Sequence, residues 1–306
     1  MLDTNKKKPQ ISVVIPVYNG EKTLLNTLNS VLIQTYPFFE VIIVDVGSDK
    51  PVESFLNSLV EDKRIRILRT ERSNVNVARN YGISKSQGDY IAMLDADDYW
   101  LENHLWDCFV LLRESGMDGL YGSHFYRRSL SEDIHNLPVF KAYEPKTGES
   151  MVDYLLTTGF GAQTSTLFTT ATSMKDILWD PKLIDRQDYD FVVRFHKKYK
   201  MTVKKEPTVV YSLLSGRTSY YETCIRFVED NISDINPMVY TNYNLSMYLR
   251  NRKKKEFQKF VAYFRREATK YKDYLSYHHY KSTLNPQSRL KEWRYKLLYI
   301  LYISRI

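Results

Sequence analysis

The most constraining feature of the sequence is a regular alternation, within the first hundred residues, of short apolar runs and segments with helical spacing. Runs rich in β-branched or aromatic side chains, typical of strands buried on both faces, occupy residues 11–17, 40–44, 64–68 and 90–94. Segments with apolar side chains three or four positions apart predict helices from Leu24 to the stop at Pro37, over 52–60 and over 76–85. Strands that alternate with helices form parallel βαβ units, so we expect an α/β fold with helices on both faces of the sheet.

The rest of the chain is less regular. Residues 164–168 and 208–211 predict strands, and residues 189–199 predict a helix. We expect residues 120–220 to extend the same domain over one end of the sheet. From about Tyr221 the spacing is helical, which predicts a C-terminal helical region over 221–306.

The net charge of +8 is unevenly distributed. The chain has 44 Lys and Arg against 36 Asp and Glu, but residues 250–306 alone carry a balance of +12 and residues 1–249 a balance of −4. The ordinary composition excludes wholesale disorder, and two cysteines argue against a disulfide scaffold. A polar start and no apolar run near the roughly 20 residues of a membrane span predict a cytoplasmic protein.

Ligands of parallel sheets bind at the carboxyl ends of the strands, where loops begin here after Val17, Val44 and Leu94. The third loop holds three carboxylates in four residues, Asp95, Asp97 and Asp98. Clustered carboxylates repel one another unless a cation or hydrogen-bond donors lie between them. Mg²⁺ or Mn²⁺ suits oxygen ligands and leaves positions for a diphosphate. The alternative is a solvated turn that caps a helix starting near Trp100.

An ordered set of motifs resembles that of family 2 glycosyltransferases: residues 11–20, 41–48, Ala78-Arg79-Asn80, 88–91, 94–98, Trp179-Asp180 and 188–194. The resemblance covers residues 10–220. It implies a GT-A glycosyltransferase domain over residues 1–220, with a nucleotide-binding half near 10–120 and an acceptor half near 120–220.

By this resemblance, Asp95 and Asp97 form the family's D-x-D motif. Asp97 is then the ligand of a Mn²⁺ or Mg²⁺ ion that bridges the diphosphate of a nucleotide sugar, and Asp95 lies near the ribose. Such a cation screens the charge that develops on the departing diphosphate. Asp98 is interpreted as a supporting residue or a helix cap rather than as a ligand.

The first loop, with Pro16, Tyr18 and Asn19, resembles the family's base pocket, in which an aromatic ring lies against the nucleotide base. Asp45 follows the second strand and belongs to the same nucleotide-sugar site. For Arg79 two interpretations stay open, because its guanidinium suits either the phosphates or an ion pair with an aspartate.

Asp188 is the candidate general base, which removes the proton of the acceptor hydroxyl in an inverting transfer. Asp185 and Asp190 are the rival bases. Asp188 also suits the cap of the helix over 189–199, and both roles are compatible.

Departures from the family pattern include Val46 and Gln187. Val46 stands where a second aspartate often reaches the uracil, so the preference for uridine is weakened, although a UDP-sugar stays the favoured donor. Gln187 replaces the glutamate before the catalytic aspartate. Residues 159–165 are expected to line the acceptor pocket. Trp100 and Trp179 are either aromatic platforms on which a sugar ring stacks or residues of the hydrophobic core.

The C-terminal region combines basic side chains with apolar residues at helical spacing, including Phe257, Phe260, Phe264 and, farther on, Leu290 and Trp293. This pattern is typical of an interfacial anchor on an anionic membrane, or of a helical cap with a solvated basic face. No nucleic-acid motif accompanies the charge, so no nucleic-acid partner is expected.

Together these features predict an inverting, metal-dependent glycosyltransferase that acts on a glycan or lipid-linked acceptor in cell-surface polysaccharide biosynthesis. A peripheral position at the inner membrane face is the expectation that the basic C-terminal region adds. The alternative is a catalytically silent GT-A module that serves as a scaffold. A sugar-nucleotide pyrophosphorylase or a dinucleotide oxidoreductase would need a glycine-rich loop after the first strand, and residues 17–22 contain a single glycine.

Overall fold

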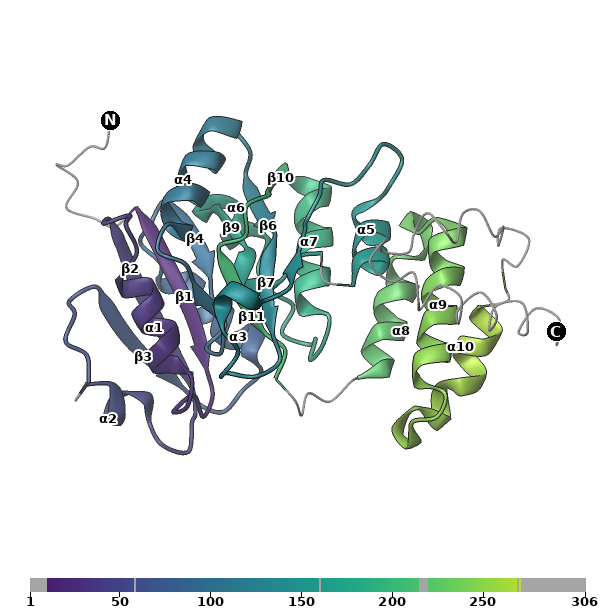
Figure 1. The fold of residues 1–306 in the computed structure, drawn as a ribbon, viewed down its shortest axis with the longest axis horizontal. Coiled ribbons are helices and arrows are strands. Elements are labelled where there is room, and N and C mark those ends of the chain that lie inside the picture. The colour runs from purple at the N-terminus through teal and green to yellow at the C-terminus, as the bar shows by residue number, and fades with distance from the viewer. Residues whose placement is uncertain (1–9, 58, 160, 215–219, 269, 271–306) are drawn as a thin grey trace. The chain divides into compact units, whose positions relative to one another are not determined.

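The computed structural model describes residues 10–57, 59–159, 161–214, 220–268 and 270, which form an α/β fold (Figure 1). The strands are β1 Ile11–Val17, β2 Phe39–Val46, β3 Ile65–Thr70, β4 Tyr90–Met93, β5 Tyr99–Trp100, β6 Gly119–Gly122, β7 His124–Arg127, β8 Val139–Phe140, β9 Phe168–Thr170, β10 Met201–Lys204 and β11 Val209–Ser212. The α-helices are α1 Leu24–Leu32, α2 Val52–Leu56, α3 Val75–Lys85, α4 His104–Ser115, α5 Met151–Thr158, α6 Ala171–Ile177, α7 Gln187–Lys198, α8 Tyr221–Asp230, α9 Pro237–Asn251 and α10 Val261–Glu267. The 3₁₀ helices are η1 Ile134–Asn136, η2 Thr164–Thr166, η3 Ile232–Asp234 and η4 Lys255–Phe260.

The strands form two sheets. The larger has the order β10-β6-β9-β4-β1-β2-β3, in which β4, β1, β2 and β3 run parallel and β9 runs antiparallel to both of its neighbours. The smaller has the order β5-β11-β7-β8. The predicted α/β class is therefore confirmed. Residues 120–220 do not simply cover one end of the sheet. Strands β9, β6 and β10 continue the large sheet beyond β4 and make it wider.

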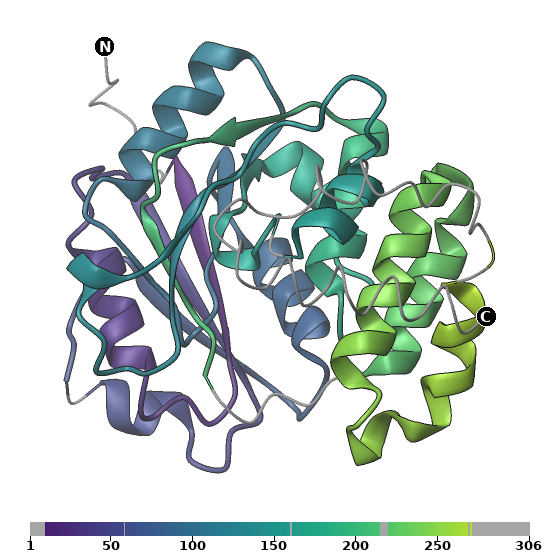
Figure 2. The same cartoon turned by 45° about the vertical axis from the view of Figure 1, so that its right-hand side comes forward.

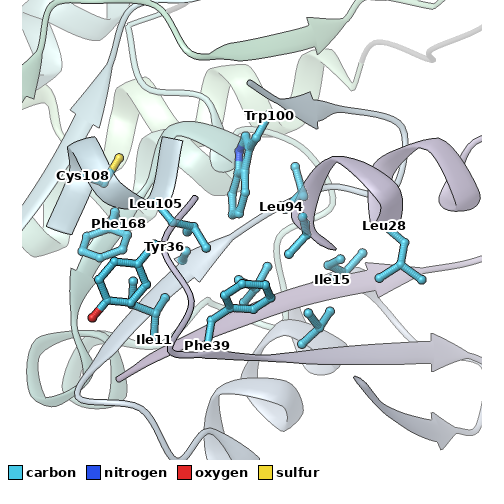
Figure 3. Close-up of a cluster of buried hydrophobic side chains, with 14 of the residues drawn as sticks. Ile11, Ile15, Leu28, Tyr36, Phe39, Leu94, Trp100, Leu105, Cys108 and Phe168 are labelled. Carbon is cyan, nitrogen blue, oxygen red and sulfur yellow. The ribbon is translucent and has the colours of Figure 1, made fainter. Parts of the chain in front are cut away.

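Alternate residues of the central strands pack on opposite faces, as the pleat requires. One core contains odd-numbered residues of β1 and β2 together with apolar residues of α1, α2 and α4 (Figure 3). On the other face, Ile42, Val44 and Val46 of β2 pack with Ala78 of α3. Helices thus cover both faces, and the central strands read as continuous apolar runs for this reason.

Two local predictions are wrong. Residues 164–168 do not form one strand, because residues 164–166 turn into η2 and β9 begins only at Phe168. No helix starts near Trp100, which belongs to β5, and α4 begins at His104. In both places side chains hydrogen-bond across the chain: the Ser30 hydroxyl accepts from the backbone of Trp100, and the Trp100 indole donates to the carbonyl of Ser165.

The chain divides into two compact units, residues 1–232 and 233–306. Helix α8, assigned above to the C-terminal region, belongs to the first unit, where Phe227 contacts the ring of Tyr189 on α7. In the second unit the side chains of Phe257, Phe260 and Phe264 are buried. Leu290 and Trp293 lie outside the described residues. No helix in the described ranges has the length and apolarity needed to span a bilayer.

The contact of α3 with the sheet depends on Gly82, because a β-carbon there would lie 2.5 Å from Cγ1 of Val14 and 3.1 Å from Cγ2 of Val44. In an open helix, Gly→Ala stabilises by up to about 1 kcal/mol. Here overpacking dominates, so we expect Gly82→Ala to lower the free energy of unfolding by about 1–3 kcal/mol in urea denaturation. Ser84→Ala on the exposed side of the same helix is the control and should change it by less than about 0.5 kcal/mol. An equally stable Gly82→Ala variant would contradict this packing.

Candidate active site

Four parallel strands, β1 to β4, end at the same edge of the large sheet, and hydrogen bonds join the loops that follow β1 and β2. Asn19, in the left-handed region with φ 50°, donates from its side chain to Asp49 and accepts from the backbone of Asp49 at 2.8 and 2.9 Å. Its backbone N–H donates to the Ser48 hydroxyl. The side chain of Asn19 therefore couples the first two loops.

A pocket of about 300 Å³ lies at this edge, and Pro16 and Tyr18 line it together with Val46 and Arg72. Tyr18 is 42% exposed, and the Arg72 guanidinium lies over its ring at 4.8 Å from the centroid. Gly47 lets the loop after β2 approach the backbone of Arg72 closely, because a β-carbon at Gly47 would lie 2.7 Å from the Arg72 nitrogen. The φ of Gly47 is +66°, which also favours glycine. An aromatic face, an apolar wall and a cation suit a flat heterocycle.

Asp45 does not line this pocket. Its buried carboxylate accepts from the backbones of Ser48 and Val52 and pairs with Arg69. Burial alone would raise the pKa of Asp45, but these N–H donors and the guanidinium hold it below its usual value. In the structure the Asp45 side chain therefore stabilises the loop that follows β2.

Asp98 anchors the loop that follows β4. Its buried carboxylate accepts from the Ser165 hydroxyl at 2.6 Å and from the backbone N–H of Ser212 at 2.7 Å. The Ser165 hydroxyl also accepts from the backbone of Asp95. The interpretation of Asp98 as a supporting residue fits these contacts. Its interpretation as a helix cap does not, because α4 has Asn103 at its N-cap.

In this structure Arg79 forms an ion pair with an aspartate, which is one of the two interpretations that the sequence left open. Its Nη2 donates to the carboxylate of Asp95 at 2.7 Å, and its Nη1 donates to Asn76 at 3.0 Å and to Gln187 at 3.5 Å. The guanidinium also lies over the ring of Trp179. Arg79 therefore connects the loop of Asp95 to the beginning of α7.

Asp97 lies between Asp95 and Asp98 in the loop after β4. Its carbonyl accepts from the Ser212 hydroxyl and from Nη2 of Arg127, the latter at 3.2 Å. In the described part of the chain, no three His, Cys, Asp or Glu side chains gather so as to hold a metal by themselves. Mg²⁺ is commonly held by one or two carboxylates and the substrate's phosphates, and the carboxylate of Asp97 fits that arrangement.

Asp188 lies in the first turn of α7. The N-cap is Arg186, in the left-handed region with φ 59°, so the prediction that Asp188 caps this helix is wrong. The carboxylate of Asp188 accepts from the backbone of Tyr189 at 3.0 Å. Burial raises its pKa to about 6, while the guanidinium groups of Arg186 and Arg79 act in the opposite direction. A carboxylate with a pKa near neutrality suits a general base.

Of the two rival bases, Asp190 is held in an ion pair with Arg194 at 2.6 Å. Asp185 accepts from the backbone of Arg186, as Asp188 does from that of Tyr189. Trp100 and Trp179 are each 1% exposed and belong to the core, so they offer no sugar platform in this structure.

The loop between β3 and α3, which brings Arg72 and Ser73 to the pocket, was not among the loops predicted to form the site. The signal was present, because β3 was predicted as a neighbouring parallel strand whose carboxyl end lies at the same edge. Ser165 was expected to line an acceptor pocket, whereas the structure shows it holding the loop after β4. Ser212 and Arg127 carried no sequence signal, because their contacts depend on the pairing of β11 with β7.

Comparisons with known proteins agree with this fold. The family described as "Glycosyl transferase family 2" matches residues 12–172, more than half of the chain. The chain belongs to glycosyltransferase family 2. The amylovoran biosynthesis glycosyltransferase AmsB of Erwinia amylovora is 30% identical over 215 residues, which cover 68% of this chain and 71% of AmsB.

Solved structures of GT-A glycosyltransferases share the fold of this family 2 chain. TarS 1–349 of S. aureus in complex with UDP-GlcNAc has a TM-score of 0.57 at 17% identity, covering 86% of this chain and 73% of that one. The chain spans 44% of a longer TarS chain. The mannosyltransferase PcManGT of Pyrobaculum calidifontis, in complex with GDP-Man and Mn²⁺, has a TM-score of 0.51 at 14% identity, covering 86% and 70%.

The pKa of Asp188 predicts a stability effect for this family 2 glycosyltransferase. Because the pKa rises on folding from 3.8 to about 6, the ionised carboxylate disfavours the folded state, and stability is lost as pH rises through this interval. Asp188→Asn removes the charge, so we expect the free energy of unfolding at pH 8 to increase by about 1–3 kcal/mol, with a smaller gain at pH 4.5.

Urea denaturation at both pH values measures this effect. Asp190→Asn is the matched control, because it removes the partner of Arg194 and should give no gain. A destabilised Asp188→Asn variant at pH 8 would show that the carboxylate is not held at an energetic cost.

Proposed function

We propose that this glycosyltransferase is an inverting, metal-dependent enzyme that transfers a sugar from a nucleotide diphosphate sugar to a hydroxyl of a glycan or lipid-linked glycan. One observation carries the proposal. Arg79 links Asp95, two residues from Asp97, to Gln187, which directly precedes Asp188. One guanidinium thus contacts a residue close to the proposed metal ligand and the residue next to the proposed base.

The donor's base is proposed to occupy the pocket of Tyr18, Val46 and Arg72. The exposed Tyr18 ring offers a face for a base, and the complexes of TarS with UDP-GlcNAc and of PcManGT with GDP-Man support a nucleotide-sugar donor. Val46 has no hydrogen-bond acceptor in its side chain, so it shapes the pocket but forms no side-chain hydrogen bond with the base. A UDP-sugar is the favoured donor, with Pro16 and Asn19 in the loop that shapes the pocket.

The diphosphate is proposed to lie at the loop after β4. Asp97 would hold Mn²⁺ or Mg²⁺ there, and Asp95, paired with Arg79, would face the ribose. When bound, the divalent cation supplies charge neutralisation for the departing diphosphate. The Mn²⁺ in the PcManGT complex supports a divalent ion.

Asp188 is proposed to accept the proton of the acceptor hydroxyl. Its raised pKa keeps the carboxylate basic at neutral pH, and Arg186 and Arg79 keep most of it ionised there. Inversion follows when the hydroxyl oxygen attacks the anomeric carbon opposite the departing diphosphate.

Substitutions that separate donor binding from chemistry test the assignment. In calorimetry with UDP, GDP and dTDP, with and without Mn²⁺, we expect Mn²⁺-dependent binding of at least one nucleotide. Asp97→Ala should weaken that binding at least tenfold. Asp188→Asn should leave it unchanged while the transfer rate falls by about 10²–10⁴-fold, the usual contribution of a general base.

Asp190→Asn serves as the control for a charge removed from the same helix and should retain most of the transfer rate. Full Mn²⁺-dependent binding by Asp97→Ala would remove Asp97 from the metal site. A wild-type protein that binds no nucleotide, with or without Mn²⁺, would favour the silent scaffold module.

The acceptor is proposed to be a glycan in cell-surface polysaccharide biosynthesis, made at the inner membrane face. Support comes from the relative AmsB, whose name refers to amylovoran biosynthesis, and from the +12 balance of residues 250–306. Basic segments bind anionic lipid surfaces at roughly 1 kcal/mol per Lys or Arg.

We expect removal of residues 286–306 to reduce sedimentation of the protein with phosphatidylserine-containing vesicles at low salt. Phosphatidylcholine vesicles are the control and should bind neither form. Unchanged sedimentation of the shortened chain would place the lipid contact elsewhere or exclude it.

A further inference from the structure

A second hollow, of about 990 Å³, lies between α1, β5 and the hairpin of β7, η1 and β8. Figure 2 shows η1, in teal, beside the purple α1. This groove shares no lining residue with the pocket of Tyr18, and neither Asp97 nor Asp188 lines it. It is therefore separate from the donor site proposed above.

The groove has an aromatic and aliphatic floor. Tyr99 and Phe125 contribute rings, and Ile33 and Leu130 contribute aliphatic side chains that are 58% and 44% exposed. Large apolar side chains this exposed leave surface that a ligand can cover. The floor suits the C–H faces of sugar rings, which pack against aromatic and aliphatic groups.

Polar side chains surround this floor. Asn26 and Asn29 lie one helical turn apart on α1, and Glu102 and His135 lie on the other walls, all four of them exposed. Carboxamides donate and accept hydrogen bonds, and a carboxylate accepts them, so these groups match hydroxyls that do both. A few polar groups around an apolar surface are typical of a small-molecule or oligosaccharide site.

The charge of the groove selects against anionic ligands. Glu102 and Glu132 are exposed acidic residues in its lining, and Asp107 is paired with Lys204. Among the described residues that line it, Arg127 is the only Lys or Arg, and it is buried with its donors directed to Asp97 and Ser212. An uncharged polyhydroxylated ligand fits better than a nucleic acid, a phosphorylated group or an acidic polysaccharide.

We propose that this groove is a second carbohydrate site that binds a neutral oligosaccharide. Resting on the proposed function, the ligand is a stretch of the glycan that also supplies the acceptor hydroxyl. The volume of the groove, about 990 Å³, suits several sugar units.

The groove adjoins the loop of the proposed metal ligand. Tyr99, in its floor, directly follows Asp98, and the Arg127 guanidinium lies over the Tyr99 ring at 5.0 Å while donating to the carbonyl of Asp97. A sugar packed on Tyr99 would therefore restrain the loop that carries Asp97. This contact connects occupancy of the groove with the donor site.

Calorimetry of the full chain with cellotetraose, maltotetraose and chitotetraose tests the proposal without any nucleotide. We expect at least one of the three to bind. The double variant Ile33→Glu/Leu130→Glu should weaken that binding at least tenfold. Leu59→Glu, a substitution of an apolar residue that is 60% exposed and does not line the groove, should bind like the wild type.

Three outcomes would overturn the proposal: none of the three tetrasaccharides binds, the double variant binds as well as the wild type, or sedimentation shows that the wild type self-associates through this face and the double variant does not. UDP, GDP and dTDP are titrated into the same samples. Their binding reports on the donor site and on folding, so failure of the groove and failure of the proposed function are distinguished.

Discussion

The buried carboxylate of Asp98 accepts hydrogen bonds from the Ser165 hydroxyl and the Ser212 backbone, and these contacts join the loop after β4 to η2 and to β11. Burial and the neighbouring carboxylates of Asp97 and Asp95 raise its pKa, and the two donors act against that rise. A carboxylate removed from water is stable only with such partners. Together with the contacts of Ser165, Ser212 and Arg127 to the backbone of Asp95 and Asp97, this side chain fixes the course of the loop.

A second buried charge, the guanidinium of Arg79, connects the loop after β4 to the beginning of α7. Arg79 is surrounded by Asp95, Asn76, Gln187 and the ring of Trp179, so its position is determined from several sides. Arginine suits this role because its planar guanidinium donates in several directions at once. The result is a preorganised connection between the loop of Asp97 and the helix of Asp188, which reduces the reorganisation that a transition state would otherwise require.

The central fold was predictable because its signals are local. Strand β1 has the predicted bounds, since a run buried on both faces is apolar throughout. The bend at η2 was not predictable, because Ser165 turns toward Asp98, 67 positions earlier in the chain. The role of Arg79 also needed the structure, because a guanidinium suits phosphate and carboxylate equally well in a sequence. The groove beside α1 is formed by segments whose proximity follows only from the pairing of β5, β11, β7 and β8.

We propose that Asp98 and Arg79 hold the loop after β4 so that Asp97 receives a divalent ion together with a nucleotide diphosphate. The most direct measurement is anomalous diffraction at the manganese edge from crystals grown with Mn²⁺ and UDP. We expect one manganese peak at the carboxylate of Asp97, with the Arg79–Asp95 ion pair intact. Nucleotide bound in the pocket of Tyr18 with its manganese away from Asp97, or with that ion pair broken, would contradict it.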